Sequence, residues 1–414
     1  MLIHSASQLV TLKGGPQRGS DLGNLGIIED GAILIRDGKI IDIGDSNSMM
    51  KKYPNEEKFN ADERVVMPGF VDPHTHAVWA GNRANEFEAK LSGKTYLEIL
   101  AEGGGILSTV AATRSASLEE LKSQTRKRLQ TMFEHGVTTI EVKTGYGLEW
   151  ETELKQLKAI LELDNEGPWD LIPTFLGAHA VPKEYEDEAE VYVDLLCNSM
   201  MPDLVVWWNK NAKKRTLPFV DVFCETGAFS LEESRTILRA AKVLGFPLKV
   251  HVDEFDNLGG ASMAVELGAI SADHIVKTSE VDIAAMVKSE IVGVSLPGTP
   301  FGLAHKEYSP VKSIIEKDGF LAIASDLNPG TTWCENPQMI IAIACRYMKL
   351  TPAQAIAAFT INAAKAVGKE DVIGSIEIGK QADILVLSVS NYQQLGYRYG
   401  INLVETVIKA GKIH

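Results

Sequence analysis

The sequence predicts an α/β protein, a parallel (β/α)8 TIM-like barrel with a small β-sandwich domain built from both ends of the chain. Between residues 65 and 371, apolar β-rich runs alternate eight times with amphipathic helical stretches, which is typical of a parallel barrel. Both ends of the chain contain short β-rich runs instead. The length of 414 residues suits one large barrel with an addition. We therefore expect a barrel domain at 65–371 and a composite β-sandwich domain at 1–64 plus 372–414.

The two ends of the chain share one pattern. The segment 31–44, GAILIRDGKIIDIG, contains two β-rich runs around Asp37-Gly38, which is a strong hairpin signal. The C-terminal end repeats the pattern at 381–389 and 404–413. Neither end shows a helix long enough to cover a sheet. The two ends are therefore expected to meet and form the sandwich together.

The barrel strands are predicted from the eight β-rich runs in the middle of the chain. Helical stretches at 118–136, 231–245 and 279–289 lie between them. Two apolar helical stretches near the C-terminus, 340–350 and 352–368, suit packing against either the barrel or a partner. The eight runs are 65–76, 136–147, 171–180, 219–230, 247–255, 268–275, 291–300 and 320–330.

Composition places the chain among ordinary globular proteins, with 45% hydrophobic and 23% charged residues. The formal net charge of −14 disfavours nucleic acid and anionic membranes as partners. Four cysteines without a Cys-X-X-Cys pair fit reduced thiols. We see no signal-peptide pattern and no apolar run near the roughly 20 residues of a membrane-spanning helix. These features predict a cytoplasmic protein.

Polar residues gather at the ends of the predicted strands. Of nine histidines, five lie at or just past the C-terminal end of a strand, as does one aspartate. In a parallel barrel this rim carries the active site. These residues are His74, His76, His179, His251, His274 and Asp326.

The stretch FVDPHTH ends a strand with two histidines, His74 and His76. Side chains two apart in a strand share a face, and a metal ion between the two imidazoles explains this crowding. With His251 and Asp326, three nitrogens and one carboxylate suit zinc or iron(II) at a site open to water. A lone strand-end histidine is more often structural, and His135 is expected only to cap a helix.

A second motif, HVDE, runs from His251 to Glu254. The chain leaves the strand there, so Glu254 can fold back over the metal and shuttle a proton from bound water. Other chemistries find less support. Gly103-Gly104-Gly105 lacks GxxxxGK[ST], and no GxSxG occurs. Lys143 offers a Schiff-base alternative, but an ion-paired barrel residue is the preferred interpretation.

The chain as a whole resembles the amidohydrolase superfamily. The resemblance rests on the strand-one His-X-His, histidines on strands five and six, the strand-eight aspartate and the split sandwich. Within that superfamily the segments NRANEF, GGGI and KTGYG are similar to the imidazolonepropionase family. This family hydrolyses the cyclic amide of 4-imidazolone-5-propanoate to N-formimidoyl-L-glutamate in histidine degradation.

The resemblance implies roles for individual residues. The implied metal ligands, for one zinc or iron ion, are His74, His76, His251 and Asp326, and the implied catalytic residues are Glu254, His274 and Asp326. Substrate binding is implied for Arg83, Tyr96, Tyr146, His179, Glu254, Asn328, Gly330 and Thr331. Arginine suits a propionate carboxylate because its planar fork offers two bonds. A single metal is expected because strand four has no bridging lysine, and the family implies a homodimer.

Two other functions stay open from the sequence. A mononuclear deaminase of a cyclic amidine, such as a cytosine-type base, would use the same metal ligands. Arg83 argues against it, since a neutral base has no carboxylate to bind. A non-catalytic scaffold of the same fold should lack several ligands, and here all four are present.

Overall fold

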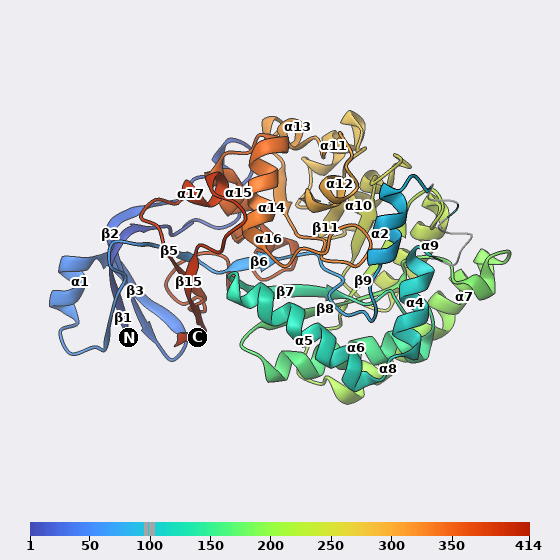
Figure 1. The fold of residues 1–414 in the computed structure, drawn as a ribbon, viewed down its shortest axis with the longest axis horizontal. Helices are drawn as coiled ribbons and strands as arrows, with labels where there is room; N and C mark the ends of the chain where they lie inside the picture. Colours follow the sequence, from blue (N-terminus) through green and yellow to red (C-terminus); the bar gives the residue numbers. More distant parts are fainter. Residues whose placement is uncertain (95–97, 99–103) are drawn as a thin grey trace.

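The computed structural model describes residues 1–94, 98 and 104–414, which form two sheets (Figure 1). Within these ranges each sheet has eight strands, and in the barrel sheet they follow sequence order, each parallel to its neighbours. This confirms the predicted barrel. Its strands are β6 (Phe70–Asp72), β7 (Val137–Lys143), β8 (Asp170–Ala178), β9 (Phe219–Cys224), β10 (Lys249–Val252), β11 (Ser271–His274), β12 (Val292–Ser295) and β13 (Phe320–Ile323).

The barrel closes between its first and last strands, just beyond their C-terminal ends. There the Asp326 amide donates to the His74 carbonyl at 3.1 Å, and the His76 amide donates to the Leu327 carbonyl at 2.9 Å. The Ser325 amide also donates to the Asp72 carboxylate at 3.1 Å. The seam of the barrel therefore brings the His-X-His segment against the strand-eight aspartate.

Helices cover the outside of the barrel (Figure 1). The helices α5 and α9 begin at capping boxes formed by Ser117 with Glu120 and by Ser230 with Glu233, the sequence pattern that starts a helix. The C-terminal helices α15 and α16 pack on β13, so they cover the barrel. The helices are α1 (Ser46–Lys52), α2 (Ala84–Leu91), α4 (Ile106–Ser115), α5 (Leu118–Glu134), α6 (Trp150–Glu166), α7 (Ala189–Leu195), α8 (Met201–Asn211), α9 (Leu231–Val243), α10 (Gly260–Leu267), α11 (Glu280–Met286), α12 (Gly298–Gly302), α13 (Val311–Glu316), α14 (Pro337–Ile343), α15 (Pro352–Ala358), α16 (Ile361–Ala366) and α17 (Gln394–Tyr397).

The second sheet joins both ends of the chain, as predicted. β14 pairs with β5, which pairs with β1, so C-terminal strands extend the N-terminal ones. The predicted hairpin is present, with Asp37 and Gly38 at φ of 49° and 74° between β2 and β3. Its strands are β1 (Leu2–Leu9), β2 (Ile28–Arg36), β3 (Lys39–Asp45), β4 (Lys58–Asn60), β5 (Val65–Pro68), β14 (Ile384–Leu387), β15 (Val404–Lys409) and β16 (Lys412–Ile413).

The first β-rich run, 65–76, is not one strand. It divides at Gly69 into β5 of the second sheet and β6 of the barrel. A side chain at Gly69 would collide with Thr138 on β7, so only glycine lets the chain cross between the sheets here. The domain boundaries at 64/65 and 371/372 stay predictions.

We expected no helix at either end of the chain that could cover a sheet, and at the N-terminal end this expectation was wrong. Helix α1 places Met49 against Leu2 and Leu34 of the second sheet, and these residues form part of a separate small core. The short α1 has few apolar residues, and its signal in the sequence is the N-cap Asp45, which accepts from the Ser48 amide.

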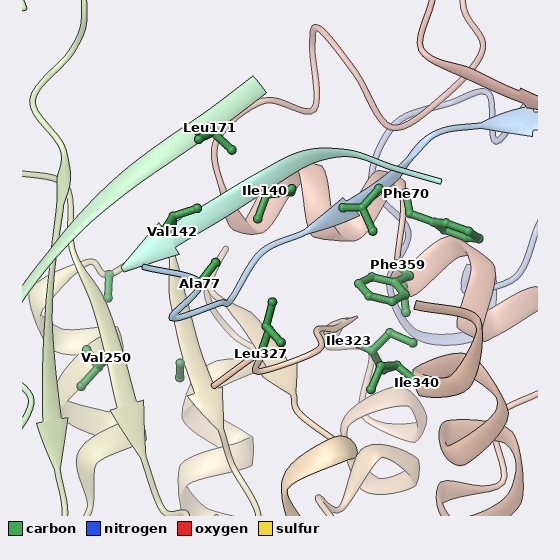
Figure 2. Packing of buried hydrophobic residues seen from close by; sticks show 14 of the residues in the cluster. Phe70, Ala77, Ile140, Val142, Leu171, Val250, Ile323, Leu327, Ile340 and Phe359 are labelled. Carbon is green, nitrogen blue, oxygen red and sulfur yellow. The ribbon is translucent and has the colours of Figure 1, made fainter. Parts of the chain in front are cut away.

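The main core lies between the barrel strands and the helices that cover them (Figure 2). Phe70 of β6 contacts Phe359 beyond α15, with ring centroids 5.8 Å apart. Leu327, at the closing seam, belongs to the same core. In the part of the chain that the structure describes, no helix has both the length and the apolar character to span a bilayer.

Candidate active site

The structure brings the four expected metal ligands together at the C-terminal rim of the barrel. One oxygen of Asp326 lies 3.6 Å from His74 Nε2 and 3.5 Å from His76 Nε2. The Nε2 atoms of His76 and His251 are 3.3 Å apart. All four side chains are buried. Donor atoms of His74, His76 and Asp326, and also of His74, His251 and His274, lie close enough to share one ion.

These residues fit a divalent metal ion. His74 Nε2 is buried with no hydrogen-bond partner among the described residues, which is unusual for a polar atom in a core. Burial lowers the pKa of His74 and of His76 well below the usual value, so both imidazoles are neutral, the form that binds metal. With His251 and Asp326, these residues give three imidazoles and one carboxylate, a set that zinc and iron(II) both accept.

A layer of buried carboxylates lies beneath the ligands. Asp273 Oδ2 accepts from His74 Nδ1 at 2.6 Å, and Asp221 Oδ2 lies 2.9 Å from His251 Nδ1. A carboxylate on Nδ1 fixes the ring orientation and leaves Nε2 free for a metal. The sequence analysis did not identify Asp221 or Asp273. Asp221 lies on β9, next to the strand of His251, whereas Asp273 lies on β11, across the barrel from His74.

Lys143 joins this layer from β7. Its Nζ lies 2.8 Å from both Glu141 and Asp221, and 3.7 Å from Asp273. Burial opposes its charge, yet these three carboxylates raise its pKa above the usual value. Although burial alone would raise the pKa of Asp221, His251 and Lys143 hold it well below the usual range. The prediction that Lys143 is an ion-paired barrel residue is confirmed.

We expect Asp273→Asn to weaken metal binding about 10- to 100-fold, the usual effect of losing such a partner. The amide keeps the shape but removes the charge that accepts from His74 Nδ1. Competition with a coloured chelator measures the affinity. Asp383→Asn is the matched control, since Asp383 is also buried and accepts from Lys409 at 2.7 Å, but it lies just before β14 of the second sheet. Equal affinities in the wild type and Asp273→Asn would contradict the role.

The expected catalytic residues surround the same point. His274 Nε2 lies 3.6 Å from Glu254 Oε2, so Glu254 folds back toward the site as expected. Burial, then the charge of Asp326, raises the pKa of Glu254 well above its usual value. Burial also raises the pKa of Asp326 to about 6. Two carboxyl groups in different environments are suited to act as a general acid and a general base.

The backbone is strained at two of these residues. His274 and Asp326 have φ of 75° and 54°, in the left-handed region that side chains disfavour. Asp253, just before Glu254, has φ of 55°. Such conformations persist where the surroundings hold them and cluster at functional sites.

The loop after Asp326 is organised by Asn328. Its amide nitrogen donates to the Asp326 carbonyl at 2.7 Å and to Thr331 Oγ1 at 2.9 Å. Its oxygen accepts from the Gly330 and Thr331 amides at 2.7 and 2.8 Å. Asn328 therefore shapes the loop that bears Gly330 and Thr331. Thr299, which the sequence analysis missed, donates to Asp326 Oδ2 at 2.5 Å.

The expected substrate-binding residues lie partly beside the metal ligands. The His179 ring stacks on His76 with centroids 4.9 Å apart, and Tyr146 lies 5.9 Å from His76. Arg83 donates through Nε to Glu86 at 2.9 Å, and its Nη1 lies so close to Gly330 that a side chain there would collide with it. Tyr96 lies outside the described residues.

A cavity of about 510 Å³ opens beside Glu254. Thr299 and Phe255 line it near the site, and Lys277 and His305 line it farther out. Its volume is in the range of small-molecule pockets, so a small substrate has room to reach Glu254.

Comparisons with known proteins agree with this geometry. The model of the amidohydrolase family matches residues 65–413. Imidazolonepropionase of Herpetosiphon aurantiacus is 48% identical, over 100% of this chain and 96% of its own length. That of Geobacillus kaustophilus is 41% identical, over 100% of this chain and 97% of its own.

Among solved structures, E. coli guanine deaminase aligns with a TM-score of 0.74 at 16% identity, over 100% of this chain and 98% of that one. This likeness supports the fold alone. The full-length relatives go further than the fold, and with the family match they show that this chain is an enzyme, a hydrolase. The chain belongs to the amidohydrolase family and, within it, to the imidazolonepropionases.

Proposed function

We propose that the protein hydrolyses the cyclic amide C–N bond of 4-imidazolone-5-propanoate to give N-formimidoyl-L-glutamate, a step of L-histidine degradation. The observation that carries this proposal is the full-length identity of 41% to 48% with relatives named imidazolonepropionase. The donor set at the barrel rim and the nearby Arg83 support it, because the reaction needs an activated water and the substrate carries a propionate.

We propose His74, His76, His251 and Asp326 as the ligands of one zinc or iron(II) ion. When bound, the ion lowers the pKa of a water molecule and polarises the ring carbonyl. Asp273 and Asp221 orient His74 and His251 from below. The ring nitrogens left without partners, and the neutral imidazoles, support this assignment.

The chain's own residues then divide the proton transfers. Asp326 accepts a proton as the water oxygen bonds to the ring carbonyl carbon. His274 orients the water and stabilises the developing oxyanion. Glu254, held protonated by its raised pKa, gives its proton to the ring nitrogen as the C–N bond breaks. One water is consumed. The ring carbonyl becomes a carboxylate, and the released ring nitrogen carries the proton that Glu254 gave.

We propose that Arg83 binds the propionate, with Tyr96, Tyr146, His179, Asn328, Gly330 and Thr331 forming the rest of the pocket. Glu86 accepts from Nε of Arg83. The terminal nitrogens have no hydrogen bond to another of the described residues, so in the proposal they form paired bonds with a carboxylate. Gly330 provides the space in which those nitrogens lie.

The deciding experiment is mass spectrometry of the metal-loaded protein with freshly made 4-imidazolone-5-propanoate. Because the substrate decays unaided, a no-enzyme control and an Asp326→Ala control run beside it. Rapid enzyme-dependent N-formimidoyl-L-glutamate supports the proposal. Conversion only at the spontaneous rate, with metal bound, overturns the substrate; ammonia release from cytosine would then favour the deaminase.

Replacing Arg83 with glutamine is expected to raise KM about 10- to 100-fold, the effect of losing a charged hydrogen bond. Turnover at saturation should change much less, because the propionate is remote from the bond that breaks. Steady-state kinetics measure both constants. Arg126→Gln, which removes an exposed arginine paired with Glu166, is the control. An unchanged KM for Arg83→Gln would show that the propionate binds elsewhere.

From the family we also propose a cytoplasmic homodimer. Analytical ultracentrifugation tests the oligomeric state, and a single species at 45.1 kDa would overturn the dimer.

A further inference from the structure

A buried carboxylate outside the metal site holds the segment that carries Tyr146. Glu153, in the first turns of α6, is fully buried. Its Oε1 accepts from the amides of Gly147 and Leu148 at 2.8 and 2.9 Å, and its Oε2 accepts from the Gly145 amide at 3.1 Å. Three backbone amides around one carboxylate form an anion nest. The residue between them in sequence is Tyr146.

The same segment also reaches His179. The Gly145 carbonyl accepts from His179 Nδ1 at 3.0 Å. A carbonyl only accepts hydrogen bonds, so Nδ1 carries the hydrogen and Nε2 keeps its lone pair. His179 stacks on His76, and its ring centroid lies 5.3 Å from that of Tyr146. The tautomer of a pocket histidine therefore depends on where Gly145 lies.

The glycines of the KTGYG motif fit this arrangement. A side chain at Gly145 would lie 2.9 Å from His179 Nδ1, and one at Gly147 would lie 2.9 Å from Glu153 Oε1. Leu148 has φ of 53°, a strained conformation that needs support from its surroundings. Glu153 provides that support, since it binds the Leu148 amide.

We propose that Glu153 is a positioning residue for substrate binding: its carboxylate holds the 145–148 segment and thereby fixes both Tyr146 and the tautomer of His179. His179 Nε2 then accepts a hydrogen bond from an N–H group of the bound ring. Glu153 contacts neither the proposed metal ligands nor the cavity beside Glu254. Only the kinetic effect of this inference rests on the proposed function. The effect on the His179 tautomer does not.

The kinetic test is Glu153→Gln, which keeps the size of the side chain but removes its charge and one acceptor. We expect KM for 4-imidazolone-5-propanoate to rise about tenfold, with kcat within about threefold of wild type, because binding is lost without loss of chemistry. Glu149→Gln is the matched control. Glu149 is the N-cap residue of the same helix and is partly exposed. Among the described residues, its carboxylate accepts a hydrogen bond from Thr152 and lies 3.7 Å from Arg114.

A second readout does not depend on turnover. In protein labelled with 15N-histidine, the spectrum of His179→Gln identifies the His179 signals. Wild type should show the Nδ1–H tautomer, and Glu153→Gln should shift the two ring-nitrogen signals toward each other. If Glu153→Gln does not fold, Glu153→Asp carries both tests, because it keeps the charge but does not reach all three amides.

The outcomes separate this inference from the proposed function. A wild type that does not turn over the substrate overturns the function, and the His179 signals then decide the inference alone. Unchanged His179 signals in the folded variant overturn the inference. A fall in kcat with unchanged KM also overturns it, since Glu153 would then act on chemistry rather than on binding.

Discussion

Replacing Glu254 with glutamine lowers kcat by about 100- to 10,000-fold, the range that proton transfer by a positioned side chain contributes, while the protein keeps its metal ion. Glutamine matches the size of the protonated carboxyl and offers an N–H, but it has no proton to give to the leaving nitrogen. Glu254 is not among the proposed ligands, so metal content should equal that of wild type. Steady-state kinetics and metal analysis on the same sample provide the comparison.

The control for this variant is Glu307→Gln. Glu307 also lines the cavity, but it is exposed and paired with Lys277. Its kcat should equal that of wild type. If Glu254→Gln with metal bound turns over at the wild-type rate, Glu254 has no part in the chemistry, and His274 becomes the next candidate for the acid.

Removing the metal ion with a chelator is expected to reduce turnover to the rate of the no-enzyme control. The proposed mechanism needs the ion to lower the pKa of the attacking water. Addition of zinc or iron(II) to the stripped protein should restore turnover, and the ion that restores it at the lower concentration identifies the preferred metal. Turnover that persists after complete removal of metal, checked by elemental analysis, would contradict the metal mechanism.

The stripped protein should stay folded, but less stable. A ligand present at 100 times its dissociation constant stabilises the native state by about 2.7 kcal/mol, so removal of the ion lowers the melting temperature. The fold itself remains because the closing bonds at the barrel seam run between backbone groups of His74, His76, Asp326 and Leu327. Circular dichroism with and without the chelator tests both statements.

The metal ligands could be predicted because their signal is local. His74 and His76 are two residues apart in the predicted first strand, so the strand period places them on one face. In the structure they lie in the segment just past β6, on either side of the bridge residue Thr75. His251 and Asp326 end strands of the same parallel barrel, and the fold brings such ends to one rim. The four ligands could therefore be predicted from the strand period and from the topology of the barrel.

The carboxylates beneath them could not be predicted in the same way. Asp273 reaches His74 across the barrel from β11 to the end of β6. Lys143 contacts Asp221 on β9, although β8 lies between their strands. Such pairs depend on the stagger of strands around the barrel, which no single strand reveals. Glu153 was missed for a similar reason, since its acceptors are backbone amides that have no signature in sequence.

The division at Gly69 has a consequence for how the protein is synthesised. β5 keeps one edge unpaired until β14 arrives, and β14 begins at Ile384, near the end of the chain. Barrel closure likewise waits for Asp326 and Leu327. Contacts between such distant residues form slowly, and unpaired strand edges are prone to wrong pairing. On the ribosome, the metal site should therefore assemble only after most of the chain has emerged, with the N-terminal sheet edge exposed until then.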